Sequence, residues 1–271
     1  MNCIFCKNKS DDSRSVEHIL PESLGNKEHC LPKGIVCDSC NNYFASKVEK
    51  IVLEKPYFKN VRYRNFICSK KGRLVPDKAL FPHKDGGWVD MWLDEKGFIL
   101  DSKDQHIVEL IKSGKVNKLI IPIIDKPDEN DNDVSRLLAK VGLEFLALKF
   151  PHNRDWINEI TTKVELDPIR NYARYGNKNF WKYHQRRIYR EEDRFVDPVN
   201  HPEPYEILHE LDFLYSDEGV MYFVIVIMGI EYAINLAESE TDFYEKWLQD
   251  NNNISPIRRF TEYMITKKNK L

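Results

Sequence analysis

The sequence has no apolar run long enough to cross a bilayer. Its longest, residues 220–230 (VMYFVIVIMGI), has the length and composition of a buried strand. The first ten residues, MNCIFCKNKS, contain no hydrophobic signal region, and no internal repeat or low-complexity tract occurs. These absences predict a cytoplasmic protein that neither spans a membrane nor is exported. The length of 271 residues allows one large domain or two smaller ones.

The chain also lacks a large net charge, which is only −2, but its charge is unevenly distributed. Residues 1–80 contain 15 Lys and Arg against 9 Asp and Glu, a net charge of +6. The remaining 191 residues therefore carry −8. We expect a polyanion to be attracted to the N-terminal part of an otherwise acidic protein.

Cysteine is sparse, and in a cytosolic chain six cysteines predict thiols or metal ligands rather than disulfides. Four of them form two C-x2-C pairs separated by 30 residues: Cys3, Cys6, Cys37 and Cys40. One pair on a knuckle and one at a helix start can place four thiolates around one ion, which predicts a structural Zn²⁺ site. Such a site is closed to substrate, so any chemistry is expected elsewhere. The ion would also stabilise a module too small for a large core.

The periodicity of the chain predicts an α+β fold. Phe44, Val48, Ile51 and Val52 mark one face of a helix that follows the second cysteine pair and stops near Pro56. Residues 16–20 are expected to form a short strand and 21–34 a loop. Further along, the sequence predicts a hairpin over 88–101, a strand over 118–125 (KLIIPIID), a helix over 134–150, and a buried strand over 219–229 that pairs with 230–237.

Between the cysteine pairs lies Ser15–Asn26 (SVEHILPESLGN), with adjacent carboxylate and imidazole side chains. The C-x2-C pair, EHILPESLGN and CDSCNNYFASKVE together resemble the zinc-knuckle branch of the HNH endonucleases, over about residues 1–55. This resemblance implies a zinc-bound ββα-metal module related to the treble clef. We expect this nuclease module over residues 1–57, a basic linker over 58–79, and a larger mixed α+β domain of unknown role over 80–271.

The resemblance also implies site residues for phosphodiester hydrolysis. His18 would be the general base that takes a proton from water, a reaction suited to imidazole at physiological pH. Glu17 and Asn41 would bind a catalytic Mg²⁺ or Mn²⁺, which prefers oxygen ligands. The family often has Asp at the position of Glu17. Asn26 is the nearest candidate for the middle Asn of the motif, and Asn42 is an alternative to Asn41.

Residues 55–76 contain seven basic residues and no acidic one, with aromatic residues interleaved. This composition predicts a surface that binds the phosphates of the nucleic-acid backbone. The alternative is a solvated linker. No recognition helix is apparent, so no sequence specificity is predicted. The candidate nucleic-acid-binding residues are Lys47, Lys59, Arg62, Arg64, Lys70, Lys71 and Arg73. Residues 170–190, rich in Arg, Tyr and Asn, could form a second contact or an ordinary structural region.

The sequence thus predicts a metal-dependent endonuclease with DNA as its substrate and RNA as the alternative. A nuclease module joined to another domain suggests, by analogy, bacterial antiviral defence. One competing hypothesis is a non-catalytic zinc-finger module that binds nucleic acid or a protein. Another is a nuclease that stays inactive until its C-terminal domain receives an activating ligand or partner. The oligomeric state is left open.

Overall fold

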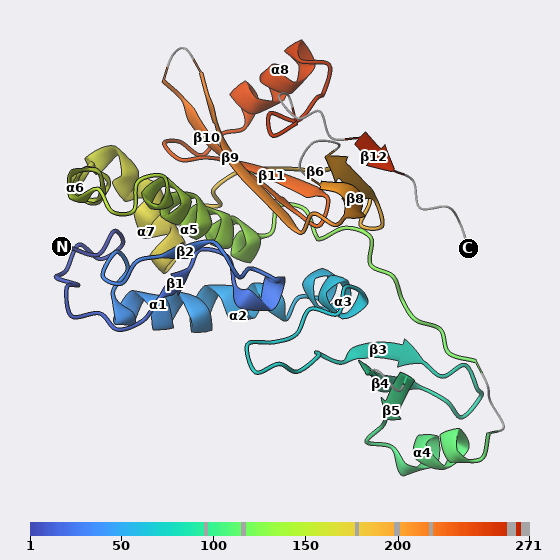
Figure 1. The fold of residues 1–271 in the computed structure, drawn as a ribbon. Coiled ribbons are helices and arrows are strands. Elements are labelled where there is room, and N and C mark those ends of the chain that lie inside the picture. Colours follow the sequence, from blue (N-terminus) through green and yellow to red (C-terminus); the bar gives the residue numbers. More distant parts are fainter. Residues whose placement is uncertain are drawn as a thin grey trace. The chain divides into compact units, whose positions relative to one another are not determined.

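The computed structural model describes residues 1–94, 97–114, 118–176, 179–197, 201–216, 219–258 and 264–266. It combines helices with several sheets, which confirms the predicted α+β class (Figure 1). The chain divides into two compact units. The first comprises Met1–Pro21, Asn26–Val52 and Asp128–Leu271, and the second comprises Glu22–Gly25 and Leu53–Pro127. Among the described residues, no helix combines the length and apolar character needed to span a bilayer.

The N-terminal part of the first unit has the order strand, strand, helix. Its elements are β1 (Glu17–His18), β2 (Cys30–Leu31), α1 (Asp38–Phe44), the π-helical segment η2 (Ala45–Glu49) and α2 (Lys50–Leu53). Phe44, Val48 and Val52 are buried as predicted, whereas Ile51 is 40% exposed. The wider i→i+5 turn of η2 changes the phase of the helix after it, which accounts for the position of Ile51.

Three helices from residues 132–175 share this unit with the N-terminal part. They are α5 (Asn132–Leu148), α6 (Arg154–Thr162) and α7 (Asp167–Tyr175). Helix α5 begins where the Asp131 side chain accepts hydrogen bonds from the backbone N–H groups of Asp133 and Val134, a typical N-cap. Almost all of α5 is buried, because the helix contacts both the N-terminal segment and the main sheet.

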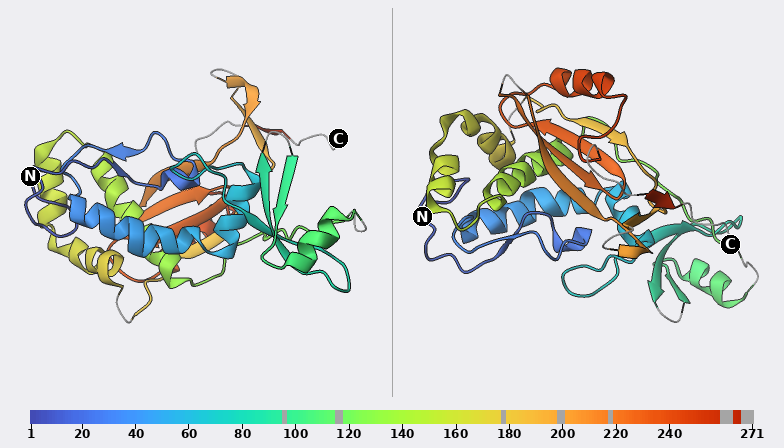
Figure 2. Two further views of the ribbon diagram at one scale, coloured as in Figure 1. Left: turned by 90° about the horizontal axis from the view of Figure 1, so that it is seen from below. Right: turned by 45° about the horizontal axis from the view of Figure 1, so that its top comes forward.

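The main sheet has the order β6-β11-β10-β9 and is antiparallel throughout. Its strands are β6 (His184–Arg187), β9 (His209–Tyr215), β10 (Met221–Ile227) and β11 (Ile230–Asn235). Phe223 packs on Phe145 of α5, while its neighbour Tyr222 packs on Tyr244 of α8 (Asp242–Asp250). The sheet therefore lies between α5 and α8 (Figures 1 and 2). A Cβ atom at Gly142 would lie 2.9 Å from a Leu236 methyl group, so glycine permits this close approach of α5.

A smaller sheet in the same unit has the order β12-β7-β8. Its strands are β7 (Arg194–Asp197), β8 (His201–Tyr205) and β12 (Met264–Thr266). Phe195 of β7 packs with Tyr189 and Val226, which joins this sheet to the core of the main one. The predicted pairing of 219–229 with 230–237 is confirmed by the β10–β11 ladder.

The first unit also contains the 3-10 helix η3 (Val164–Leu166), and the second unit has helices and strands of its own. They are η1 (Glu22–Leu24), α3 (Pro56–Arg64), β3 (Asp77–Leu80), β4 (Trp88–Asp94), β5 (Gly97–Asp101) and α4 (Gln105–Lys112). The predicted hairpin over 88–101 is confirmed by β4 and β5, and residues 95–96 of its turn lie outside the described residues. Residues 118–125, expected as a strand, contribute a single bridge between Leu80 and Ile120. Pro122, which has no N–H, cannot continue a ladder there.

These units differ from the division expected from the sequence. Residues 58–79, expected as a linker, include most of α3, whose Tyr57, Phe58 and Val61 side chains are buried. Residues 80–127 belong with α3 in the second unit, while residues 128–271 belong with the N-terminal segment. The reason is packing. The apolar face of α5 is covered in part by the N-terminal segment, so the two share one compact unit.

Candidate metal centre and active site

The four paired cysteines form one cluster. Their sulfur atoms all lie within 4.8 Å of one another, close to the separation of about 3.8 Å expected around tetrahedral zinc. Cys37 precedes α1, and its Sγ accepts the backbone N–H of Cys40 at 3.4 Å. The backbone N–H of Cys37 points to Sγ of Cys3, also at 3.4 Å. Helix α1 and the N-terminal knuckle thus bring the two pairs together, and the cluster can hold a metal ion such as zinc.

The electrostatics of the cluster favour one thiolate, at Cys3, while burial raises the pKa of Cys37. A hydrogen bond with the Cys40 thiol lowers the pKa of Cys3 to about 5, and the same contact raises that of Cys40. On α7, burial opposes the charge of Arg174, but the Cys40 and Cys6 sulfurs beside it raise its pKa above the usual value. A divalent cation would allow all four sulfurs to be ionised together, as zinc does in four-cysteine sites.

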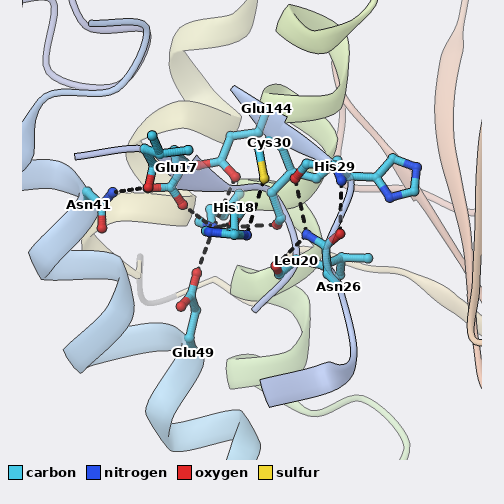
Figure 3. A network of polar contacts seen from close by, with 12 residues as sticks. Glu17, His18, Leu20, Asn26, His29, Cys30, Asn41, Glu49 and Glu144 are labelled. Atoms are coloured by element: carbon cyan, nitrogen blue, oxygen red, sulfur yellow. Dashed lines mark hydrogen bonds and ion pairs between the residues drawn. The ribbon is translucent and has the colours of Figure 1, made fainter. Parts of the chain in front are cut away.

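His18 lies on the two-stranded ribbon of β1 and β2. β1 pairs antiparallel with β2, and His18 is opposite Cys30. The His18 Nδ1 atom lies 3.3 Å from Sγ of Cys30, so the second strand holds the partly exposed imidazole (Figure 3). Adjacent strand residues point to opposite faces, and Glu17 therefore leaves the ribbon on the other side.

Asn41 joins the start of α1 to this ribbon. Its Nδ2 donates to the carbonyl oxygen of Val16 at 3.3 Å, across 25 positions of sequence. Because the amide nitrogen faces the backbone of β1, the amide oxygen is the atom that can bind a hard cation. The structure thus brings Asn41 beside Val16, the residue that precedes Glu17.

Glu17 is only 4% exposed and forms an ion pair with Lys140 of α5, with Oε1 at 2.7 Å from Nζ. Lys140 is itself fully buried and also pairs with Glu49 of η2 at 2.6 Å and with Glu144 of α5 at 3.0 Å. The other carboxylate oxygen of Glu17, Oε2, is buried and accepts no hydrogen bond within the described structure. Glu17 therefore has one oxygen held by Lys140 and one buried oxygen that accepts no hydrogen bond within the described structure.

The pKa values follow from this burial. Burial raises the pKa of Glu17, and the nearby Lys140 ammonium only partly offsets the shift. Burial also raises the pKa of Glu144 well above its usual value. Lys140 is disfavoured as a cation by burial, yet the Glu144, Glu17 and Glu49 carboxylates raise its pKa well above the usual value. The lysine is thus a charged group enclosed by acidic ones.

Asn26 is 2% exposed, and both ends of its amide are bonded to backbone. Its Nδ2 donates to the carbonyl oxygens of Leu20 and His29 at 2.8 and 3.1 Å. Its Oδ1 accepts from the N–H groups of Glu28 and His29 at 3.2 and 3.0 Å. Figure 3 shows the amide lying between these groups. Asn26 therefore shapes the loop between β1 and β2.

The candidate nucleic-acid-binding residues fall into different environments. Arg62 is 3% exposed, and its Nη1 donates to the Leu53 carbonyl oxygen at 3.4 Å, so it does not present its charge to a phosphate. Arg64 is partly buried and bonds to Asn60 and the Ile124 carbonyl oxygen. Lys59 pairs with Glu54 at 3.6 Å. Lys47 on η2 is exposed.

Three of the candidates gather on one tight turn of the second unit. The turn closes with hydrogen bonds from Ser69 N–H to the Arg73 carbonyl oxygen and from Gly72 N–H to the Ser69 carbonyl oxygen. Gly72 has a φ of +70°, which glycine adopts without strain. Lys70, Lys71 and Arg73 are exposed there, and the Lys70 side chain, 77% exposed, lies 3.6 Å from Glu22. The turn presents a compact positive surface.

Comparison with known families identifies the segment that contains His18, Glu17 and Asn41. Residues 3–55 match a family model described as HNH endonuclease, which covers about a fifth of the chain. This match confirms the family predicted for the N-terminal segment. It indicates nuclease activity and a nucleic-acid substrate in general terms. No curated protein and no solved structure matches the chain.

The sequence analysis predicted Glu17 but did not identify Lys140 or its other two acidic partners, Glu49 and Glu144. One signal was present. Lys140 and Glu144 lie four residues apart on the same stripe of α5 as Leu137 and Val141. Charged residues within an apolar helix stripe indicate a buried ion pair rather than a solvated face. Their partners on β1 and η2 could not be read from that pattern.

Proposed function

We propose that the N-terminal module is a metal-dependent endonuclease that hydrolyses phosphodiester bonds in DNA. The supporting observation is the link between Asn41 and β1. A side chain at the start of α1 is bonded to Val16, the residue directly before the strand that carries Glu17 and His18. The four-cysteine cluster, which we propose holds Zn²⁺, positions this helix start.

In this proposal His18 is the general base. Its imidazole is partly exposed, and Cys30 restrains it from the neighbouring strand. It would accept a proton from a water molecule that attacks the scissile phosphate. Oε2 of Glu17 and the amide oxygen of Asn41 would hold Mg²⁺ or Mn²⁺, and the chemistry of these oxygens fits such an ion. When bound, the ion would stabilise the charge that develops on the phosphate and the leaving oxygen.

The exposed basic residues would hold the substrate through its backbone. Lys47 and the turn bearing Lys70, Lys71 and Arg73 offer cations to phosphates without reading the bases. Arg62 and Arg64 are assigned to the protein interior instead. Residues 128–271 then act as the structural partner of the module in the same compact unit.

Incubation of the purified chain with supercoiled plasmid tests the proposal. With Mg²⁺ or Mn²⁺ we expect nicking that disappears in EDTA and in His18→Ala, while Cys68→Ser, which changes an exposed thiol outside the cluster, retains it. DNA that is bound equally by the wild type and His18→Ala, and cut by neither, would favour the non-catalytic binding module. An RNA substrate tested in parallel would decide between the two nucleic acids.

A further inference from the structure

Lys140 of α5 makes an unusual set of contacts with β1. Besides its three carboxylate partners, its Nζ donates to the carbonyl oxygens of His18 and Ile19 at 3.3 and 3.4 Å. The ammonium therefore contacts both the side chain of Glu17 and the backbone on the far side of His18. A lysine has only three N–H groups, so these five acceptors share them.

Side chains also bind the backbone of the segment 16–20, which contains β1. Asn41 binds the Val16 carbonyl oxygen, Lys140 binds those of His18 and Ile19, and Asn26 binds that of Leu20. Asn41 and Asn26 belong to the segment that matches the family model, whereas Lys140 lies 122 positions beyond His18. One of the three supports of β1 therefore comes from outside the matched segment.

The charges around Lys140 make this support difficult to replace. Glu17, Glu49 and Glu144 surround one ammonium, and the side chains of the lysine and of Glu144 are fully buried. A loss of the positive charge would leave carboxylates close together in a site of low polarity. The Glu17 side chain would then lose the partner that fixes one of its oxygens, together with the tether on the His18 backbone.

We propose that Lys140 is a positioning residue of the nuclease site, which holds the backbone of β1 at His18 and one carboxylate oxygen of Glu17, so that the His18 imidazole keeps the orientation needed for the reaction. The inference rests on the proposed function. It implies that the nuclease site is completed by α5 and is not contained in the segment 3–55 alone. Lys140 does not touch the substrate in this assignment. It acts through Glu17 and the backbone of His18.

The test uses the full chain with Lys140→Met combined with Glu144→Leu. This double substitution removes the lysine together with its fully buried partner and leaves Glu17 and Glu49 as the remaining carboxylates, so circular dichroism first checks that the variant folds. The matched control is Arg186→Met with Glu231→Leu, which removes a buried ion pair between β6 and β11 of the main sheet. We expect kcat for plasmid nicking to fall about 10–100-fold in the first variant, with KM within about threefold, and both to be unchanged in the control.

A second measurement separates this inference from the proposed function. The ring resonances of His18 in a ¹H–¹³C spectrum, assigned by their loss in His18→Gln, should shift in the Lys140 variant and not in the control. A shift in a protein that never cuts DNA would reject the nuclease and leave the positioning role intact. Unchanged resonances and unchanged kcat would overturn the positioning role.

Lys140→Arg covers the case in which the double variant does not fold. It keeps the charge but replaces a compact ammonium with a larger planar group that cannot reach the same acceptors. A positioning role predicts a loss of kcat of about tenfold or more with the charge retained. Full activity in Lys140→Arg would show that the lysine only balances charge, which would contradict the inference.

Discussion

Nε of Arg170 donates a hydrogen bond to the carbonyl oxygen of Ile4 at 2.6 Å, although the two residues are 166 positions apart. Ile4 lies between Cys3 and Cys6, and Arg170 belongs to α7. Nη2 of the same guanidinium donates to the Ile160 carbonyl oxygen at 2.6 Å, and the residue is 2% exposed. A buried cation from α7 therefore binds a backbone carbonyl oxygen of the cysteine-bearing knuckle.

Arg170→Met should lower the free energy of unfolding by about 2–4 kcal/mol, because two carbonyl oxygens lose a charged donor inside the protein. Urea unfolding followed by circular dichroism measures the change. Lys7→Met is the control, since Lys7 forms a partly exposed ion pair with Asp167 worth less than about 1 kcal/mol. Equal losses in the two variants would contradict the structural role of Arg170.

The ion pair between Asp167 and Lys7 makes the stability of the fold depend on pH. A hydrogen bond from Lys7, partly opposed by burial, and the charge of Arg170 lower the pKa of Asp167 below its usual value. A carboxyl group whose pKa is lower in the folded state stabilises the fold above its unfolded pKa of about 3.9. That contribution is lost as the pH falls through the lower, folded value.

Asp167→Asn should therefore differ from the wild type in unfolding free energy at about pH 6, and the difference should shrink towards about pH 3. Because the side chain is about one third exposed, we expect less than about 1 kcal/mol at the higher pH. Urea unfolding at several pH values provides the measurement. A difference that stays constant over this range would show that the ionisation of Asp167 does not contribute.

Removal of the metal should unfold the N-terminal module. We expect one zinc ion per chain by elemental analysis, lost in Cys37→Ser, because this residue supplies one of the four clustered sulfurs. Chelation should likewise lower the unfolding midpoint of the wild type. Cys68→Ser is the control, since Cys68 is exposed and outside the cluster. A full zinc content in Cys37→Ser would rule out the four-cysteine site.

The features that the sequence predicted are local ones. The two C-x2-C pairs, the helix that follows Cys40 and the strands over 219–237 each depend on spacing within a short segment. The ion pair between Glu17 and Lys140 depends instead on how α5 packs against β1, which no local pattern specifies. For the same reason the sequence did not reveal that residues 128–271 share a compact unit with the nuclease module.

Composition alone also could not separate the basic residues of 55–76. Arg62 follows Val61 on α3, where the buried face of the helix encloses its side chain. Lys70 lies on a closed turn that exposes it. Basic residues of the same segment are therefore either buried in the protein, like Arg62, or exposed to solvent, like Lys70. Helix packing decides between the two.

The basic turn supplies the last prediction. Substitution of Lys70, Lys71 and Arg73 by alanine should weaken DNA binding, because these exposed cations can release counterions from phosphates. The ion pair of Lys70 with Glu22, with its lysine exposed, is too weak to prevent this. Each phosphate contact contributes about 0.9 to the slope of log affinity against log salt, so the slope should fall by about 2–3.

Fluorescence anisotropy of a labelled duplex over a range of salt concentrations measures that slope. Lys246→Ala, which removes an exposed lysine of α8, is the control and should leave the slope unchanged. Arg62→Ala should instead lower the unfolding midpoint, since Arg62 is bonded inside the protein. If the triple variant kept the wild-type slope, the turn would be an ordinary solvated surface, and DNA would have to bind through other cations.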